Sequence, residues 1–337
     1  MPSNARMAIW PAMSLACAAA ILSAFFIGKY SMSWQEFALS LRHYWLDGGD
    51  AAPSAVDRVL WQVRLPRIVA GIVVGACLSV AGAAYQNMFR NPLVSADILG
   101  ISAGAGLGAM LAIFFGLPLL LIQLGAFIGG LLVVVLVLTI ARMARHHSPI
   151  LSLVLTGIAV SSLFGGGIAL VRILADPYRD LPTMTFWLMG SLNGVALEDL
   201  RAVLPVMLAG MLPLVLLRWR MNVLSLDDEE AQALGVNVRN TRLLFIMGAT
   251  LMTASAVAIT GIISWIGLVI PHVARLLVGP DFHVLLPASL MIGGAFLVLA
   301  DTVARSAFAI EIPLGIITVG IGAPFFLSLL IRKEPRS

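Results

Sequence analysis

Residues 261–275 read GIISWIGLVIPHVAR, an apolar run suited to a membrane interior but interrupted by Gly261, Gly267 and Pro271. A simple membrane-spanning helix needs none of these interruptions. Inside lipid every backbone N–H and C=O must find a partner within the protein, so a broken helix survives only where protein or a water-filled cavity surrounds it. The segment therefore predicts a membrane protein with a lined interior rather than a passive anchor.

The composition of the whole chain indicates that lipid surrounds it. Of 337 residues, 60% are hydrophobic and only 11% are charged, and the mean hydropathy is +0.99. A water-soluble domain needs more surface charge. The net charge of +4 comes almost wholly from arginine and is too small to suggest a nucleic-acid partner. Cys17 and Cys77 lie in apolar runs, where we expect buried small side chains rather than a disulfide or metal pair.

Gaps in the charge pattern, two of them long enough to be divided at breaks around 116–118 and 261–264, predict an all-α polytopic membrane protein with ten transmembrane helices in one domain, residues 1–337. The first uncharged block, about 22 residues long, is too long for a signal peptide and suits a bilayer core of about 30 Å. Arginines near the ends of the blocks place both termini in the cytoplasm, together with a loop at 218–240. The predicted spans are approximately 7–28, 64–89, 94–115, 118–141, 148–171, 198–217, 241–261, 264–277, 284–304 and 312–331.

A Gly–Pro spacing that occurs twice in the chain suggests that the ten spans form two related halves. Gly82 and Pro92 are ten positions apart, as are Gly261 and Pro271. Each pair follows a long span and leads into a short one that contains glycine. Five spans per unit is an odd number, so a second copy would enter the membrane inverted, as in many transporters. An inverted five-plus-five repeat is the prediction, and coincidence at two residues is the alternative.

The glycine-rich stretch at 100–108 does not indicate a nucleotide site. Gly100, Gly104 and Gly108 recur every four residues, a spacing that lets helix backbones approach closely. The phosphate-binding pattern GxxxxGK[ST] is absent, because neither Lys29 nor Lys333 can complete it. If this chain takes part in ATP-driven transport, another chain must hydrolyse the ATP.

The loop at 218–240 combines charge with apolar residues. Acids at 227–230 suit the first turn of a short helix, and Gly235 suits its end. Apolar side chains in a loop that should face water suggest a docking surface, with a solvated connector as the alternative. These apolar residues are Met221, Val223, Leu224, Leu226, Leu234 and Val236.

Ionisable residues near membrane depth are candidate functional groups, with structural pairing or helix capping an equal alternative. Asp97, His272, Asp301 and Glu311 qualify. His272 has no second ligand at metal-binding spacing, so we predict no metal site. The three acids lie near span ends, which disfavours a secondary transporter with coupling carboxylates at mid-span. No nucleophile–base pair is present, which disfavours an intramembrane enzyme.

Three stretches together resemble the FecCD-type ABC permeases, which import iron–siderophores, haem, cobalamin and related chelates. They extend in the family's order from about residue 60 to the C-terminus. The first comprises RLPR at 64–67, GAAYQNMFRNP at 82–92 and LGISAG at 99–104. The second comprises LDDEEA at 226–231 and LGV at 234–236. The third comprises GLVIPH at 267–272, ADTVAR at 300–305 and PLGI at 313–316.

The resemblance implies a permease subunit of an ATP-driven importer in the bacterial inner membrane, which is not itself an enzyme. It implies a second permease subunit, giving a homodimer, a cytoplasmic pair of ABC ATPases that hold ATP and Mg²⁺, and a periplasmic substrate-binding protein. No cofactor is expected on this chain. The expected cargo is an iron chelate, a siderophore or haem, with cobalamin or an oxyanion such as molybdate as alternatives.

The resemblance also implies roles for individual residues. Arg64, Arg67 and Arg305 would dock the binding protein by pairing with its glutamates. An inner gate would lie at Ser148, Pro149 and Ser152. Pro149 and Ile150 stand where the cobalamin branch is expected to have small hydroxyl residues, which disfavours cobalamin as cargo. Coupling to the ATPase would use Asn222, Leu224, Leu226, Asp228, Glu229, Ala231, Leu234, Gly235 and Val236.

Overall fold

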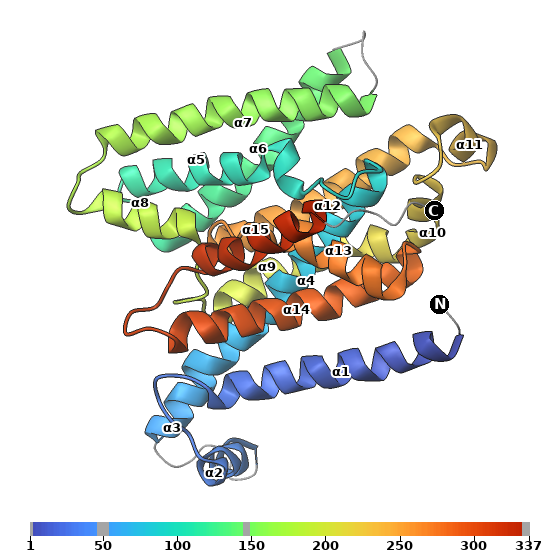
Figure 1. Ribbon diagram of the computed structural model, residues 1–337. Helices are drawn as coiled ribbons and strands as arrows, with labels where there is room; N and C mark the ends of the chain where they lie inside the picture. The colour runs from blue at the N-terminus through green and yellow to red at the C-terminus, as the bar shows by residue number, and fades with distance from the viewer. Residues whose placement is uncertain (1–2, 46–53, 144–148, 332–337) are drawn as a thin grey trace.

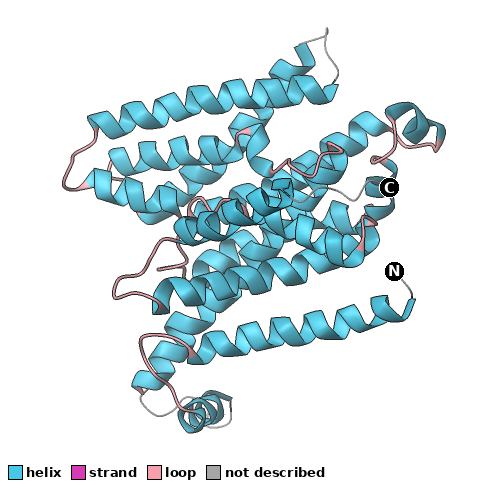
Figure 2. Ribbon diagram, in the orientation of Figure 1, coloured by secondary structure: helices cyan, strands magenta, loops and turns pink. Residues whose placement is uncertain are grey.

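The computed structural model describes residues 3–45, 54–143 and 149–331, and the regular elements of this part of the chain are all helices (Figure 2). Within these described ranges, seven helices are long and apolar enough to cross a membrane, and three apolar helices are shorter. The prediction of an all-helical polytopic membrane protein is confirmed. The elements are α1 (Ser3–Phe26), α2 (Trp34–Trp45), α3 (Ala55–Asp57), η1 (Arg58–Arg64, π-helical), α4 (Leu65–Met88), η2 (Ala96–Leu99, 3₁₀), α5 (Ile101–Phe114), α6 (Leu119–Met143), α7 (Pro149–Leu174), α8 (Asp180–Met189), α9 (Leu197–Leu216), α10 (Arg218–Val223), α11 (Asp228–Ala233), α12 (Val238–Thr260), α13 (Ile266–Val278), α14 (Phe282–Ser306) and α15 (Leu314–Ile331).

Each predicted span overlaps one helix, and the largest difference falls at 94–115. There the chain forms the short turn η2, passes through Gly100 with a left-handed φ of 77°, and only then enters α5. Helix α8 was not predicted, because its ten residues are too few to give a spanning signal.

Only one of the three interruptions in the run at 261–275 breaks the helix. Gly261, with φ of 70°, ends α12, and α13 begins after Trp265, with φ of 73°. The expectation that Gly267 and Pro271 also interrupt the helix is wrong, since both lie inside α13. Gly267 has a packing role instead: a Cβ on Gly82 of α4 would lie 1.9 Å from its carbonyl oxygen.

The two stretches that share the Gly–Pro spacing, 82–92 and 261–271, therefore touch, but the first glycines of the two stretches are not equivalent. Gly82 lies within α4, whereas Gly261 ends α12. What recurs is the order of elements. The deeply buried α4 is followed by the short α5, and the deeply buried α12 is followed by the short α13. Each short helix begins directly after a left-handed residue, Gly100 or Trp265.

Close backbone packing at the regularly spaced glycines is confirmed. A Cβ on Gly108 of α5 would lie 2.0 Å from the carbonyl oxygen of Gly125 on α6. In the same way α4 meets α14, where a Cβ on Gly75 would lie 2.2 Å from the carbonyl oxygen of Gly293. Glycines at these crossings have no side chains to hold the helices apart, so the helix backbones come into contact.

The bundle has two distinct ends (Figure 1). The start of α1 lies at the same end as α10 and α11, and α2 and α3 lie at the opposite end. We call these the α11 end and the α2 end. At the α2 end, aromatic side chains of α2 pack on the last turn of α1, with the rings of Phe26 and Trp34 4.0 Å apart between centroids.

Candidate functional sites at the two ends of the bundle

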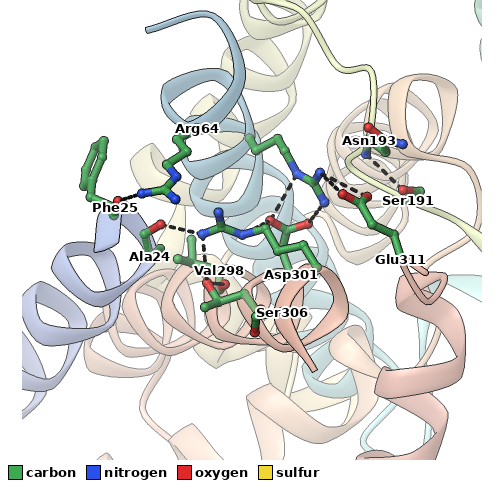
Figure 3. A network of polar contacts seen from close by, with 12 residues as sticks. Ala24, Phe25, Arg64, Ser191, Asn193, Val298, Asp301, Ser306 and Glu311 are labelled. Atoms are coloured by element: carbon green, nitrogen blue, oxygen red, sulfur yellow. Dashed lines mark hydrogen bonds and ion pairs between the residues drawn. The ribbon is translucent and has the colours of Figure 1, made fainter. Parts of the chain in front are cut away.

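Five charged side chains meet at the α2 end, and we call them the arginine cluster: Arg64, Arg67, Asp301, Arg305 and Glu311 (Figure 3). Arg64 ends η1, and Arg67 lies in the first turn of α4. Asp301 and Arg305 lie one turn apart near the end of α14, and Glu311 lies in the connection to α15.

Arg67 binds both acids of the cluster. Its Nη2 donates to Oδ1 of Asp301 at 2.7 Å and its Nε to Oδ2 at 3.3 Å. Its Nη1 donates to the Oε2 and Oε1 atoms of Glu311 at 3.1 and 3.2 Å. The planar guanidinium suits such two-point contacts. Arg67 thus joins α4, α14 and the segment before α15.

Arg64 and Arg305 bind the end of α1 instead. Arg64 donates to the carbonyl oxygens of Phe25 and Tyr30, and Arg305 donates to that of Ala24. The last carbonyls of a helix lack partners within it and form its negative end, so guanidinium groups suit them. Among the described residues Arg64 has no carboxylate partner, and the Nε of Arg305 is 3.6 Å from Oδ2 of Asp301.

The structure brings together the three arginines proposed for docking, but it buries them. Arg64, Arg67 and Arg305 are 2%, 6% and 7% exposed. The prediction that these arginines pair with glutamates of the binding protein did not include their partners within the chain. Asp301 lies four residues before Arg305, and that spacing was the one local signal of a pair.

The other ionisable candidates have separate surroundings. Ser102 donates to Asp97 beside the start of α5. The ring of His272 lies 6.4 Å from that of Phe325 between centroids. In the described part of the chain, no group of three His, Cys, Asp or Glu side chains could hold a metal ion.

At the α11 end, the loop at 218–240 forms the two short helices α10 and α11, and we call it the coupling segment. The predicted helix in the acidic part is confirmed as α11. Gly235, with φ of 80°, ends it, and the N–H of Val236 returns to the carbonyl of Ala231 at 3.1 Å. This is the glycine-dependent ending that left-handed geometry allows.

Polar contacts attach the coupling segment to three helices of the bundle. Asn222 of α10 donates to Asp281, which precedes α14, at 2.6 Å, and accepts from the N–H of Phe282 at 2.7 Å. Asp228 of α11 accepts from Arg90, just after α4, at 3.0 Å. The same Asp228 oxygen accepts from Arg242 of α12 at 2.9 Å.

The residues proposed for coupling differ in exposure, and Asn222 and Asp228 are half-buried. Leu224, Ala231 and Val236 are at most 4% exposed and belong to the chain's own core, so they cannot form the surface of contact that the sequence suggested. Met221 and Val223 are buried in the same way. The exposed members are Leu226 at 40% and Leu234 at 54%, together with Glu229 and Gly235.

The proposed gate residues lie at the start of α7. Ser148 is outside the described residues, and Pro149 is the first residue of the helix. Ser152 is buried, at 4% exposed.

Residues 16–332 match the FecCD transport family, and the chain belongs to it. A cobalamin import permease of Halobacterium salinarum is 43% identical over 286 residues, which cover 85% of this chain and 76% of that protein. An iron chelatin transport permease of Helicobacter pylori is 38% identical over 325 residues, covering 96% and 98%. A molybdate import permease of Haemophilus influenzae is 39% identical over 312 residues, covering 92% and 91%.

The fold is also similar to a solved structure described as an inward-facing conformation of a metal-chelate type ABC transporter. The TM-score is 0.85 at 36% identity, covering 96% of this chain and 98% of that one. The chain is thus a permease subunit of a type II ABC importer. It is not itself catalytic and binds no cofactor, because ATP belongs to the partner ATPase. The expected ATPase and binding-protein partners follow from the family, and the secondary-transporter alternative is wrong.

Proposed function

We propose that the chain pairs with a second copy of itself in the bacterial inner membrane and imports an iron chelate, either a siderophore complex or haem. A periplasmic binding protein delivers the cargo, and a cytoplasmic ATPase dimer drives the cycle. Family membership over residues 16–332 carries the importer part of this proposal. Cobalamin and molybdate stay as alternative cargoes, since relatives named for both match most of the chain. The residues at 149–150 therefore do not exclude cobalamin.

Ten crossings with both termini in the cytoplasm are part of the proposal. The seven long and three shorter apolar helices supply that number. Two successions of a long buried helix and a short one, each short helix starting after a left-handed residue, support an inverted five-plus-five repeat. The α2 end then faces the periplasm and the α11 end faces the cytoplasm.

An excess of positive charge supports docking of the binding protein at the arginine cluster. Three guanidinium groups face two carboxylates, and Arg64 is bonded only to carbonyl oxygens. A glutamate on the partner would supply the missing negative charge. Because the cluster is buried, docking here requires Arg64 to exchange its carbonyl partners for that glutamate.

Arg64→Gln tests docking best, because changing Arg67 would also remove the hydrogen-bond donor of Asp301 and Glu311 within the chain. We expect Arg64→Gln to weaken the binding of the purified binding protein to the permease–ATPase complex by about tenfold or more, with a smaller loss in Arg64→Lys. Arg58→Gln is the matched control, since Arg58 is exposed near the same end. Unchanged affinity in a folded Arg64→Gln complex would rule out docking at this residue.

The exposed leucines support the contact with the ATPase. Leu226 and Leu234 flank α11 and lie beside exposed acids such as Glu229, a mixture typical of a partner surface. The double variant Leu226→Asp, Leu234→Asp should prevent co-purification of the ATPase, whereas Leu226→Met, Leu234→Met should retain it. A stable complex with both aspartates would show that the ATPase binds elsewhere.

A further inference from the structure

Arg90 stands at a backbone position that favours glycine. It follows the last turn of α4, and its φ is 51°. The N–H of Asn91 returns to the carbonyl of Gln86 at 3.1 Å, and the N–H of Arg90 returns to that of Asn87 at 3.2 Å. These bonds close a helix ending in which a left-handed residue is required, and glycine adopts that geometry at the least cost. A long side chain here therefore has a reason beyond the turn.

The side chain of Arg90 holds the connection between α10 and α11. Its Nη2 donates to Oδ1 of Asp228 at 3.0 Å, its Nη1 to Asp227, and its Nε to the carbonyl of Leu224 at 3.4 Å. Three donors of one rigid fork thus reach one short stretch of the coupling segment. Such multiple contacts fix orientation as well as distance, which a single lysine charge does not.

The end of α4 beside Arg90 is itself fixed within the bundle. Gln86 donates to the carbonyl of Leu268 on α13 at 3.1 Å, and Arg275 of α13 donates to Asn87 at 3.4 Å. Helix α4 is unbroken over its 24 residues, about 36 Å, and Arg67 of the arginine cluster lies in its first turn at the opposite end. Displacement of its end at Arg90 therefore has a rigid, buried path to the opposite end of the bundle.

Two further contacts attach the coupling segment elsewhere, but neither reaches α4. Arg242 joins Asp228 to α12, and Asn222 joins α10 to the start of α14. Arg90 alone, among the described residues, bonds the side chains of α11 or its N-cap to the end of α4.

We propose that Arg90 is the positioning residue that transmits movement of the coupling segment to α4, so that ATP hydrolysis inside is coupled to opening at the arginine cluster. The inference rests on the proposed importer function and deepens it. Arg90 touches neither cargo nor ATP. It sets the geometry through which the ATPase contact acts on the transport path.

Arg90→Gly is the deciding variant, because it removes the side chain and also removes the backbone strain of a non-glycine residue at a positive φ. In the complete complex, reconstituted with its binding protein, we expect the ATPase to co-purify while the ratio of ATP hydrolysed to cargo moved rises by about tenfold. Arg90→Lys should give a smaller rise. Arg142→Ala, which removes an exposed arginine from the last turn of α6, outside the coupling segment, should leave the ratio unchanged.

A wild-type ratio in Arg90→Gly would overturn the proposal. If that variant does not assemble, Asp227→Ala, Asp228→Ala removes both carboxylate acceptors instead, and a wild-type ratio there would overturn the proposal equally. Failure of the importer function would look different: the wild-type complex itself would show no ATP-driven uptake.

Discussion

The approach of α4 to α13 depends on the absence of one methyl group. A Cβ on Gly82 would lie 1.9 Å from the carbonyl oxygen of Gly267 and 2.6 Å from its carbonyl carbon and Cα, all backbone atoms that cannot rotate away. We expect Gly82→Ala to destabilise the folded protein by about 1–3 kcal/mol, despite the better helix propensity of alanine. Thermal unfolding in detergent measures the loss. Gly165→Ala, with no heavy atom within 4 Å of its Cβ, is the control, and equal melting temperatures would contradict the prediction.

The Arg67–Asp301 pair is the strongest buried ionic contact at the arginine cluster, with side chains 7% and 5% exposed. Removing one partner leaves the other charged and buried, so Arg67→Ala or Asp301→Ala should each cost about 3–5 kcal/mol. The double variant should cost clearly less than the sum. Additive losses in this cycle would show that the two residues act independently. Arg179→Ala removes the partner of Asp180 in a pair whose arginine side chain is 73% exposed, and it should cost much less than either of these changes.

At the scale of elements, the sequence predicts the long helices that the thickness of the bilayer requires. It does not predict the short elements that depend on local packing. An uncharged run of about 20 residues is required for crossing, so the positions of the long helices could be predicted from gaps in the charge pattern once two long gaps were divided at 116–118 and 261–264. Helix α8 and the π-helical η1 carry no such requirement. The burial of Arg67 could not be predicted either, because its partners lie 234 and 244 residues further along the chain.

The start of α14 has a pH dependence whose sign follows from its N-cap. The pKa of Asp281 is lowered, first by the N–H of His283 and then by the amide of Asn222, among smaller contributions. A lowered pKa in the folded state means that the carboxylate stabilises the protein above its unfolded pKa of about 3.9, and that this stabilisation is lost as the pH falls through the lower value.

We therefore expect Asp281 to contribute equally to the melting temperature from pH 8 to pH 5, and to lose its contribution below about pH 4. Comparison with Asp281→Asn over this range measures the effect. The difference between the two proteins should shrink only at the acidic end. A difference that stayed unchanged from pH 5 down to pH 3 would contradict the prediction.

At the scale of the whole molecule, α4 and α14 join the two candidate sites. Both helices contribute to the arginine cluster at one end, through Arg67 and Asp301. Both meet the coupling segment at the other end, through Arg90 and Asp281. Between these ends their backbones touch at Gly75 and Gly293. Sequence motifs identified the residue types at both ends, but only the fold shows that one pair of helices connects them.

The connection has meaning for transport only if the two ends lie on opposite sides of the membrane. Gln35 on α2 and Gln232 on α11 are exposed and mark the α2 end and the α11 end. In a background with Cys17→Ala and Cys77→Ala, which removes the native thiols, a membrane-impermeant maleimide should label Gln35→Cys in intact spheroplasts and Gln232→Cys only in inverted vesicles. Arginine-rich loops at the α11 end favour this orientation. The predicted topology places an odd number of crossings between residues 35 and 232. Labelling of both cysteines from one side would require an even number and therefore a different topology.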